Sequence, residues 1–129
     1  TLRATSNTDP AVNNALSNRL TVIASAGVDL TGQRPVDGSA PGEGNGPEAQ
    51  PVTTLNLAPG ASGLLPVYIN NTGSRDDTFD LAYSNGNFSA GALPAGWQVA
   101  LLADGGAGDC STVGGAVANT GPIPAGGHR

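Results

Sequence analysis

Short apolar alternations that end at turn residues constrain this chain more than any other feature. The stretch "LPVYINNTGSRDDTFDLAYS", residues 65–84, reads as two alternating strands around the polar turn "NTGSRDD". Helical periodicity is scarce, and clusters of Gly, Pro, Asn and Asp separate further short runs. Several short strands within about 100 residues predict an all-β Greek-key sandwich. Beyond the N-terminal region, the expected strands cover residues 26–32, 52–58, 63–70, 78–84, 94–103 and 113–118.

The supply of core residues points the same way. The chain has 20 Gly and 10 Pro but only five aromatic residues and no Met, so Ala, Val and Leu must fill the interior, which suits thin strands. The net charge of −5, without a basic cluster, argues against nucleic acid as a partner. No run approaches the roughly 20 apolar residues that cross a bilayer. Few charges (12 %) among abundant Thr, Asn, Ser and Gly are typical of secreted bacterial surface proteins, so we expect an extracellular location.

The N-terminal region admits two interpretations. Val12, Leu16 and Leu20 fall at helical spacing behind a possible N-cap. We favour a β-hairpin with strands from Leu2 to Asn7 and from Leu16 to Val22, because "SNTDP" is a strong turn cluster between Thr- and Val-rich flanks. No secretory leader precedes this strand-like opening, so we expect a mature or excised sequence. The later stretch "QRPVDGSAPGEGNGPEAQP" has almost nothing to bury and is predicted to be an exposed linker.

Four segments, in this order and spacing, carry a family resemblance: "APG", "LPVYINNTGSRDDTFDL", "LPAGWQVALL" and "TGPIPAGG". Together they resemble the immunoglobulin-like repeat modules of bacterial cell-surface proteins, the conserved-repeat type of S-layer, adhesin-like and glycosidase-associated chains. The resemblance covers about residues 52–127 and implies an immunoglobulin-like sandwich. It also implies a non-catalytic role in building fibres, stalks or lattices.

The resemblance further implies a repeat that is out of phase. In such modules the "AGG" segment leads into closing strands that end in something like "LRATSN", which here lies at the N-terminus. We therefore divide the chain into a closing hairpin of a preceding repeat (1–25), a short strand with a linker (26–51) and a module without its closing strands (52–129). We expect the hairpin to fill the closing position in its own chain, or in a neighbour by strand donation. The alternative is a fragment whose neighbouring repeats supply those strands. The expected self-association residues are Leu2, Ala4, Leu16, Leu20 and Val22.

Two acidic loops are candidate metal sites. Asp76 and Asp77 in "GSRDDT", and Asp104 and Asp109 in "DGGAGD", offer the oxygen ligands that Ca²⁺ prefers, so calcium is the possible cofactor. Neither loop matches the full calcium-loop pattern, and Asp also favours turns by bonding its own backbone. Both interpretations stay open.

The sequence offers no convincing catalytic set. Cys110 is the single cysteine, and the single histidine, His128, lies in a loop-rich tail, which makes a poor nucleophile and base pair. An unpaired cysteine in a secreted chain more often bridges to another chain, so Cys110 is a disulfide candidate. No G-x-S-x-G elbow and no phosphate-binding loop occur. We expect a protein that is not an enzyme.

The single tryptophan separates two hypotheses about function. Trp97 in the core beside Phe79 and Leu81 would fit a structural module, which we favour. An exposed Trp97 that shares a face with tyrosines would fit a carbohydrate-binding accessory module of a secreted hydrolase. The sequence therefore predicts a self-associating module of a bacterial surface layer or fibre, with carbohydrate binding as the alternative.

Overall fold

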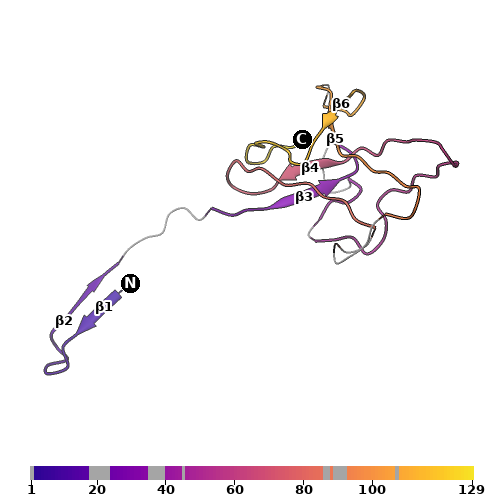
Figure 1. Ribbon diagram of the computed structural model, residues 1–129. Coiled ribbons are helices and arrows are strands. Elements are labelled where there is room, and N and C mark those ends of the chain that lie inside the picture. The colour runs from indigo at the N-terminus through magenta and orange to yellow at the C-terminus, as the bar shows by residue number, and fades with distance from the viewer. Residues whose placement is uncertain are drawn as a thin grey trace.

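The computed structural model describes residues 2–17, 24–34, 40–44, 46–85, 88, 93–106 and 108–129. The described residues form six short strands and no helix, so the all-β prediction is confirmed. The strands pair as three two-stranded antiparallel sheets, β1 with β2, β3 with β4 and β5 with β6 (Figure 1). Their bounds are β1 Leu2–Thr5, β2 Asn13–Leu16, β3 Val28–Thr31, β4 Tyr68–Asn71, β5 Leu102–Asp104 and β6 Val113–Ala116.

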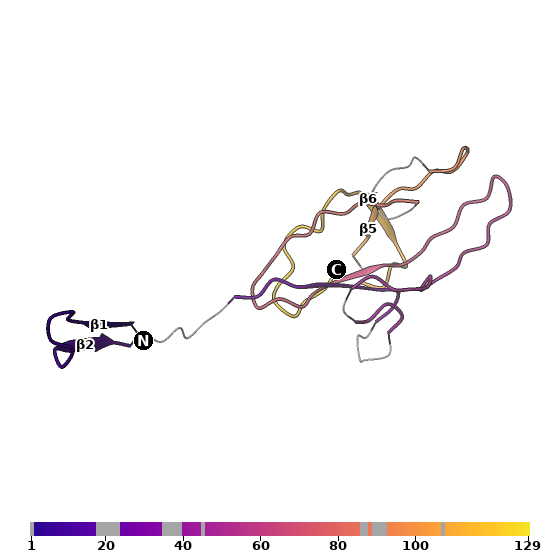
Figure 2. The ribbon, with the colours of Figure 1, turned by 90° about the horizontal axis from the view of Figure 1, so that it is seen from below.

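The N-terminal hairpin exists, but its second strand begins earlier than the sequence predicted. β1 pairs with β2 in the register Leu2↔Leu16 to Thr5↔Asn13, and the intervening turn is held by the Ser6 and Asp9 side chains. The helical interpretation is wrong for the part that is described, through residue 17. Leu20 and Val22 lie outside the described residues. Both views place the hairpin apart from the rest of the chain (Figures 1 and 2).

We call the described chain from residue 24 onward the body. At its centre three segments pair side by side, with β4 in the middle. On one edge β4 pairs with β3, from Val28↔Asn71 to Thr31↔Tyr68. On the other edge runs the C-terminal segment 126–129, joined to β4 by an Asn70↔His128 bridge. Strand β3 confirms the expectation for residues 26–32. Strand β4 starts at Tyr68 rather than at residue 63, two residues after Pro66, which lacks the N–H that pairing with β3 would require.

Three of the strands expected from the sequence are absent or mostly absent among the described residues. Residues 78–84 form no strand, although Asp77↔Ile123 and Asp80↔Asn119 bridges lay this stretch beside residues 118–123. Of residues 94–103 only the last two fall within β5, and residues 52–58 form no strand. The prediction for residues 113–118 is confirmed by β6. Pro94 and Gly96 interrupt the start of residues 94–103, whereas residues 52–58 and 78–84 contain neither Gly nor Pro.

The buried centre is small and largely polar. Among the described residues the buried apolar ones are Tyr68, Ile69, Ile123 and Ala40. Ala40 is the one buried residue in the described part of the expected linker, which is otherwise largely exposed. Asn71 is 1 % exposed and takes part in five hydrogen bonds. Two of them close the 71–75 turn, and the other three bond Ile123, Gly126 and Gly127. No buried polar side-chain atom of the described residues lacks a partner, so hydrogen bonds rather than apolar packing hold this centre together.

The chain as a whole exposes far more surface than its mass implies. A folded monomer of 12.6 kDa should expose about 6,200 Å², whereas this chain exposes 9913 Å². Fifteen large hydrophobic residues of the described part are among those exposed. The isolated chain therefore leaves unburied a surface larger than a standard protein–protein interface requires from one partner.

Candidate functional site

The hairpin presents an unpaired outer edge along β1. The Ser6 N–H donates to the Val12 carbonyl (2.9 Å), which fixes the backbone groups of even-numbered β1 residues toward β2. The amides and carbonyls of Arg3 and Thr5 therefore point away from β2, and no described residue bonds them. An isolated two-stranded hairpin is at best marginally stable in water. The β1 edge is thus a strand edge that lacks a partner.

The outer edge of β2 differs, because one of its amides is already used. The Ala15 N–H points away from β1 and donates to the Asn14 side-chain oxygen at 2.8 Å. A strand that added to β2 would have to break this bond. The hairpin therefore offers β1, rather than β2, as its pairing edge.

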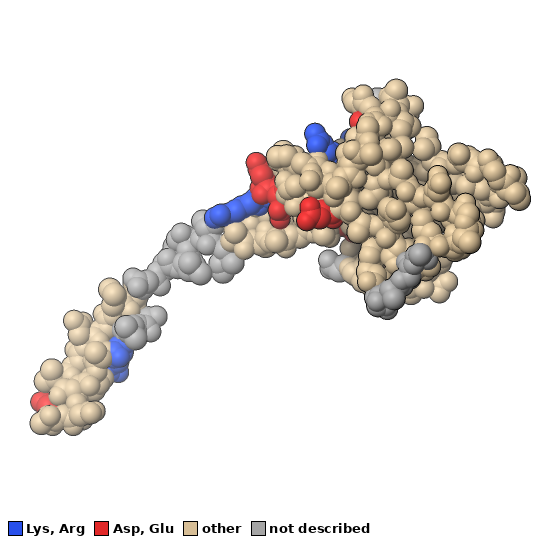
Figure 3. Space-filling view, in the orientation of Figure 1, with Lys and Arg blue, Asp and Glu red and all other residues tan. Residues whose placement is uncertain are grey.

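A second unpaired edge lies immediately before β4, along residues 63–67. Leu64, Leu65 and Val67 are 62 %, 50 % and 48 % exposed. No described residue forms a backbone hydrogen bond with this segment. The chain also has no charged residue from Ala49 to Ser74, whereas proteins usually guard open edges with charges. In the view of Figure 3 the end of the body farthest from the hairpin shows no charged side chain, in agreement with this uncharged stretch.

The C-terminal segment shows which side of residues 63–67 is available. Ile69 and Arg129 exchange two backbone hydrogen bonds (2.7 and 2.9 Å), and the Asn71 N–H donates to the Gly127 carbonyl (2.9 Å). Odd-numbered amides of this stretch thus face the C-terminal segment, while the Thr72 N–H, of the even series, faces Gly27. Pro66 belongs to the even series. It therefore ends the ladder with β3 and leaves the Leu65 and Val67 amides intact for a partner on the other side.

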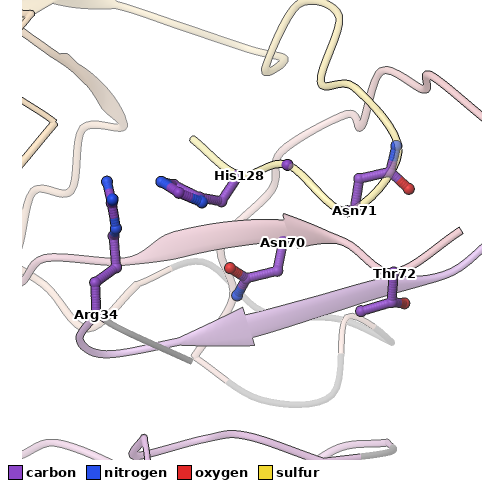
Figure 4. A pocket seen from close by; sticks show the side chains of 7 residues that line it. Arg34, Asn70, Asn71, Thr72 and His128 are labelled. Atoms are coloured by element: carbon purple, nitrogen blue, oxygen red, sulfur yellow. The ribbon is translucent and has the colours of Figure 1, made fainter. Parts of the chain in front are cut away.

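A surface pocket of about 420 Å³ lies beside this ladder, lined by Arg34, Asn70, Asn71, Thr72, Gly126, Gly127 and His128 (Figure 4). The Arg34 guanidinium donates to the Gly108 carbonyl at 3.0 Å and lies 5.8 Å from the centre of the Tyr68 ring. His128 points toward Arg34 in Figure 4, and burial, helped by the Arg34 charge, lowers the pKa of His128. These polar groups mainly tie loops together.

The carboxylates of the two candidate metal loops each bond backbone N–H groups. Asp104 accepts backbone N–H bonds from Gly108 (2.7 Å), Gly106 (2.9 Å) and Cys110 (3.0 Å). The bonds from Gly108 and Gly106 lower the pKa of Asp104, and bonds from Ser111 lower the pKa of Asp109. Asp104 is therefore the organiser of its own loop, as the turn interpretation expected.

The carboxylates of the other loop also accept backbone N–H groups, one within the loop and one from a segment far away in the sequence. Asp77 accepts from the Thr78 N–H (2.8 Å), and Asp76 from the Ala125 N–H (3.3 Å). Among the described residues no three His, Cys, Asp or Glu side chains gather where a metal ion could be held. Calcium binding at either loop stays a prediction.

Cys110 lies half-buried beside Tyr68. Burial, followed by a hydrogen bond with Cys110, raises the pKa of Tyr68. The backbone of Cys110 has a positive φ of 57°, a conformation that the Asp104 bond to its amide supports. A disulfide from Cys110 to another chain stays a prediction.

The expectation that Trp97 packs in the core is wrong. Its side chain is 59 % exposed, and Tyr83 is 51 % exposed, whereas Tyr68 is buried. Trp97 follows a turn closed by its N–H bond to the Pro94 carbonyl (3.0 Å), and no strand holds it against the sheet. The exposed indole is an observation that favours the carbohydrate-binding alternative.

Sequence reasoning missed the two most connected features of the body. The sequence pattern places Asn71 in a turn and residues 126–129 in a loop-rich tail. In the structure Asn71 ends β4, and residues 126–129 form the second edge partner of β4. The paired Asn residues before "TG" were the available signal, since Asn side chains often bond turn backbones.

No helix of the described residues is long and apolar enough to cross a membrane. Searches of family models, curated proteins and solved structures found no match to this chain.

Proposed function

We propose that this chain is a non-catalytic structural module that self-associates by backbone pairing at strand edges. The observation that carries the proposal is the coexistence in one chain of two uncharged or weakly charged strand edges, along β1 and along residues 63–67, that pair with no described residue. The unburied surface described above adds to it, because association would remove exposed Leu and Val side chains from water.

The setting of such a module would be a bacterial surface layer or surface fibre outside the cell. The composition and the resemblance to immunoglobulin-like repeat modules support this setting. In the assembled state the three small sheets would form parts of one immunoglobulin-like sandwich, with the added strands supplying what the isolated chain lacks. Calcium at the acidic loops or a Cys110 disulfide would act as a lock between copies.

The structural roles of the polar groups also support a non-catalytic module. The Asp104 carboxylate accepts hydrogen bonds from three backbone amides. The Arg34 guanidinium donates to the Gly108 carbonyl and lies over the Tyr68 ring. A catalytic acid, base or nucleophile needs a partner within hydrogen-bond reach and room for a substrate.

The test is the mass of the native chain in solution by light scattering, over a range of concentrations, followed by negative-stain imaging. The proposal predicts particles heavier than 12.6 kDa that grow with concentration and form ordered assemblies. Repeating the measurement with a calcium chelator tests the lock, because calcium-bridged assemblies would loosen. A single-chain mass at every concentration would overturn the proposal.

The exposed Trp97 supports a second candidate, a carbohydrate-binding accessory module. Aromatic faces bind the apolar faces of sugar rings, and Trp97 and Tyr83 are both available. Soluble polysaccharides should then shift the fluorescence of the native chain, whose only indole is Trp97. A Tyr83→Ala variant should weaken the shift, and an Ala82→Ser variant is the matched control. No shift with any polysaccharide would remove this candidate.

A further inference from the structure

We propose that strand β1 of one copy adds to residues 63–67 of a second copy, antiparallel and in line with the C-terminal segment 126–129. The inference rests on the proposed self-association and names its donor, its acceptor and its register. A second copy is the occupant, because the same chain carries both a donor edge that is unstable alone and an acceptor edge that lies unguarded.

The acceptor continues a ladder that already exists. Arg129 pairs with Ile69 on the same side of the chain to which the Leu65 and Val67 amides point. A strand added beside residues 63–67, in line with residues 126–129, could bond the amides and carbonyls of Leu65 and Val67 and the backbone of Gly63. Pro66 does not interfere, because its missing N–H belongs to the side that faces β3. Strand addition of this kind satisfies main-chain groups first and selects partners by side chains.

The donor matches this acceptor through alternate residues. Only Arg3 and Thr5 turn their backbone groups outward from β1, so they must lie opposite residues of the odd series. Arg3 opposite Leu65 and Thr5 opposite Gly63 meets that requirement. A shift by two residues would bring the chain ahead of Leu2 onto the place that Arg129 occupies beside Ile69. A shift by two residues in the other direction would place Thr5 opposite Ala61, whose N–H already donates to the Ala58 carbonyl (3.0 Å). The register is therefore Arg3 with Leu65.

Side chains agree with this register. Residues directly opposite each other share a face of the sheet, so Ala4 falls beside the exposed Leu64, and the aliphatic stem of Arg3 falls over the exposed Leu65. Leu16, which is exposed in the hairpin, lies on the same face as Ala4. No like charges meet, because the acceptor has none.

The exposed surface of the chain is large enough to include an interface of ordinary size. The chain exposes roughly 3,700 Å² more than a folded monomer of its mass should. A standard interface removes about 800 Å² from each partner. Since each chain has one donor and one acceptor, two copies that exchange hairpins form a closed pair, and copies that donate in one direction form a fibre.

Disulfide trapping tests the register in the full chain with the background change Cys110→Ser. One sample mixes an Arg3→Cys chain with a Leu65→Cys chain, and the matched control replaces the second by Leu64→Cys. Hydrogen-bonded pairs of opposite residues have Cα atoms about 5.5 Å apart, within the range that a disulfide spans. The proposal predicts that the first mixture cross-links between chains several-fold more than the control, whose side chain points to the other face.

A proline variant tests the same edge without a cysteine. Leu65→Pro removes an amide that no described residue uses, so the body should fold while the measured mass falls to that of one chain. Leu64→Pro, on the opposite series, is the control and should still assemble. If the native chain assembles but neither cross-linking nor Leu65→Pro discriminates, the β1 proposal is wrong and self-association stands. A native chain that never exceeds 12.6 kDa overturns both.

Discussion

Replacing Asn71 by alanine should destabilise the body more than any other single polar change among the described residues. The Asn71 amide nitrogen donates to the Arg75 carbonyl (2.8 Å) and to the Ile123 carbonyl (2.9 Å), and its side-chain oxygen accepts from the Gly73 N–H (2.9 Å). The residue is 1 % exposed, so water cannot replace these partners without opening the turn.

The magnitude follows from those three bonds. Each contributes about 0.5–1.5 kcal/mol net, and a buried carbonyl left without a donor costs about 1–3 kcal/mol. We expect Asn71→Ala to lower the free energy of unfolding by about 2–4 kcal/mol, a large part of the 5–15 kcal/mol typical of a domain.

Denaturant unfolding followed by circular dichroism measures this change. Asn56→Ala is the control, since Asn56 is exposed and its replacement should change stability by less than about 0.5 kcal/mol. All samples need equal protein concentration, because assembly stabilises the folded chain by mass action. Equal midpoints for the two variants would refute the role assigned to Asn71.

Three further predictions concern the loop at Asp104, the core and the exposed indole. The pKa of Asp104 lies below its ordinary value of 3.8, because backbone N–H groups stabilise the carboxylate. The loop should therefore be ordered above pH 3.8 and lose this order as the pH falls through the lowered pKa. A titration of the Asp104 carboxyl group at or above 3.8, followed by nuclear magnetic resonance, would contradict this. Ile123→Ala, at a residue 1 % exposed, should cost about 2–4 kcal/mol in denaturant unfolding, and Leu102→Ala, at a half-exposed one, clearly less; equal losses would show that Ile123 is not the core residue. Trp97 fluorescence should be red-shifted and readily quenched by iodide, whereas a blue, protected emission would restore a buried tryptophan.

The sequence predicted those elements whose cause is local. The turn cluster "SNTDP" located the hairpin, and the alternation through Val28 and Leu30 located β3, because both signals lie within a few residues. Strand ends were less accurate. The β2 strand precedes its predicted position, since the bond from Ser6 to Val12 sets the turn length and hence the register.

The remaining errors have a long-range cause. Residues 126–129 contain Gly and no apolar alternation, so only their pairing with residues 69–71, far away in the sequence, makes them part of the ladder. Trp97 lies in an apolar alternation, but no strand forms there among the described residues. Its side chain therefore stays exposed. Local pattern reports which faces are apolar, but it does not report which partner covers them.

Amide hydrogen exchange of the native chain at low and high concentration tests the central claim most directly. The account predicts that the amides of Arg3, Thr5, Leu65 and Val67 exchange rapidly when dilute and become protected together as the chain assembles. The amides of Ile69 and Asn71, which are bonded within one chain, should be protected at both concentrations. Assembly that leaves the first four amides unprotected would contradict pairing at these two edges.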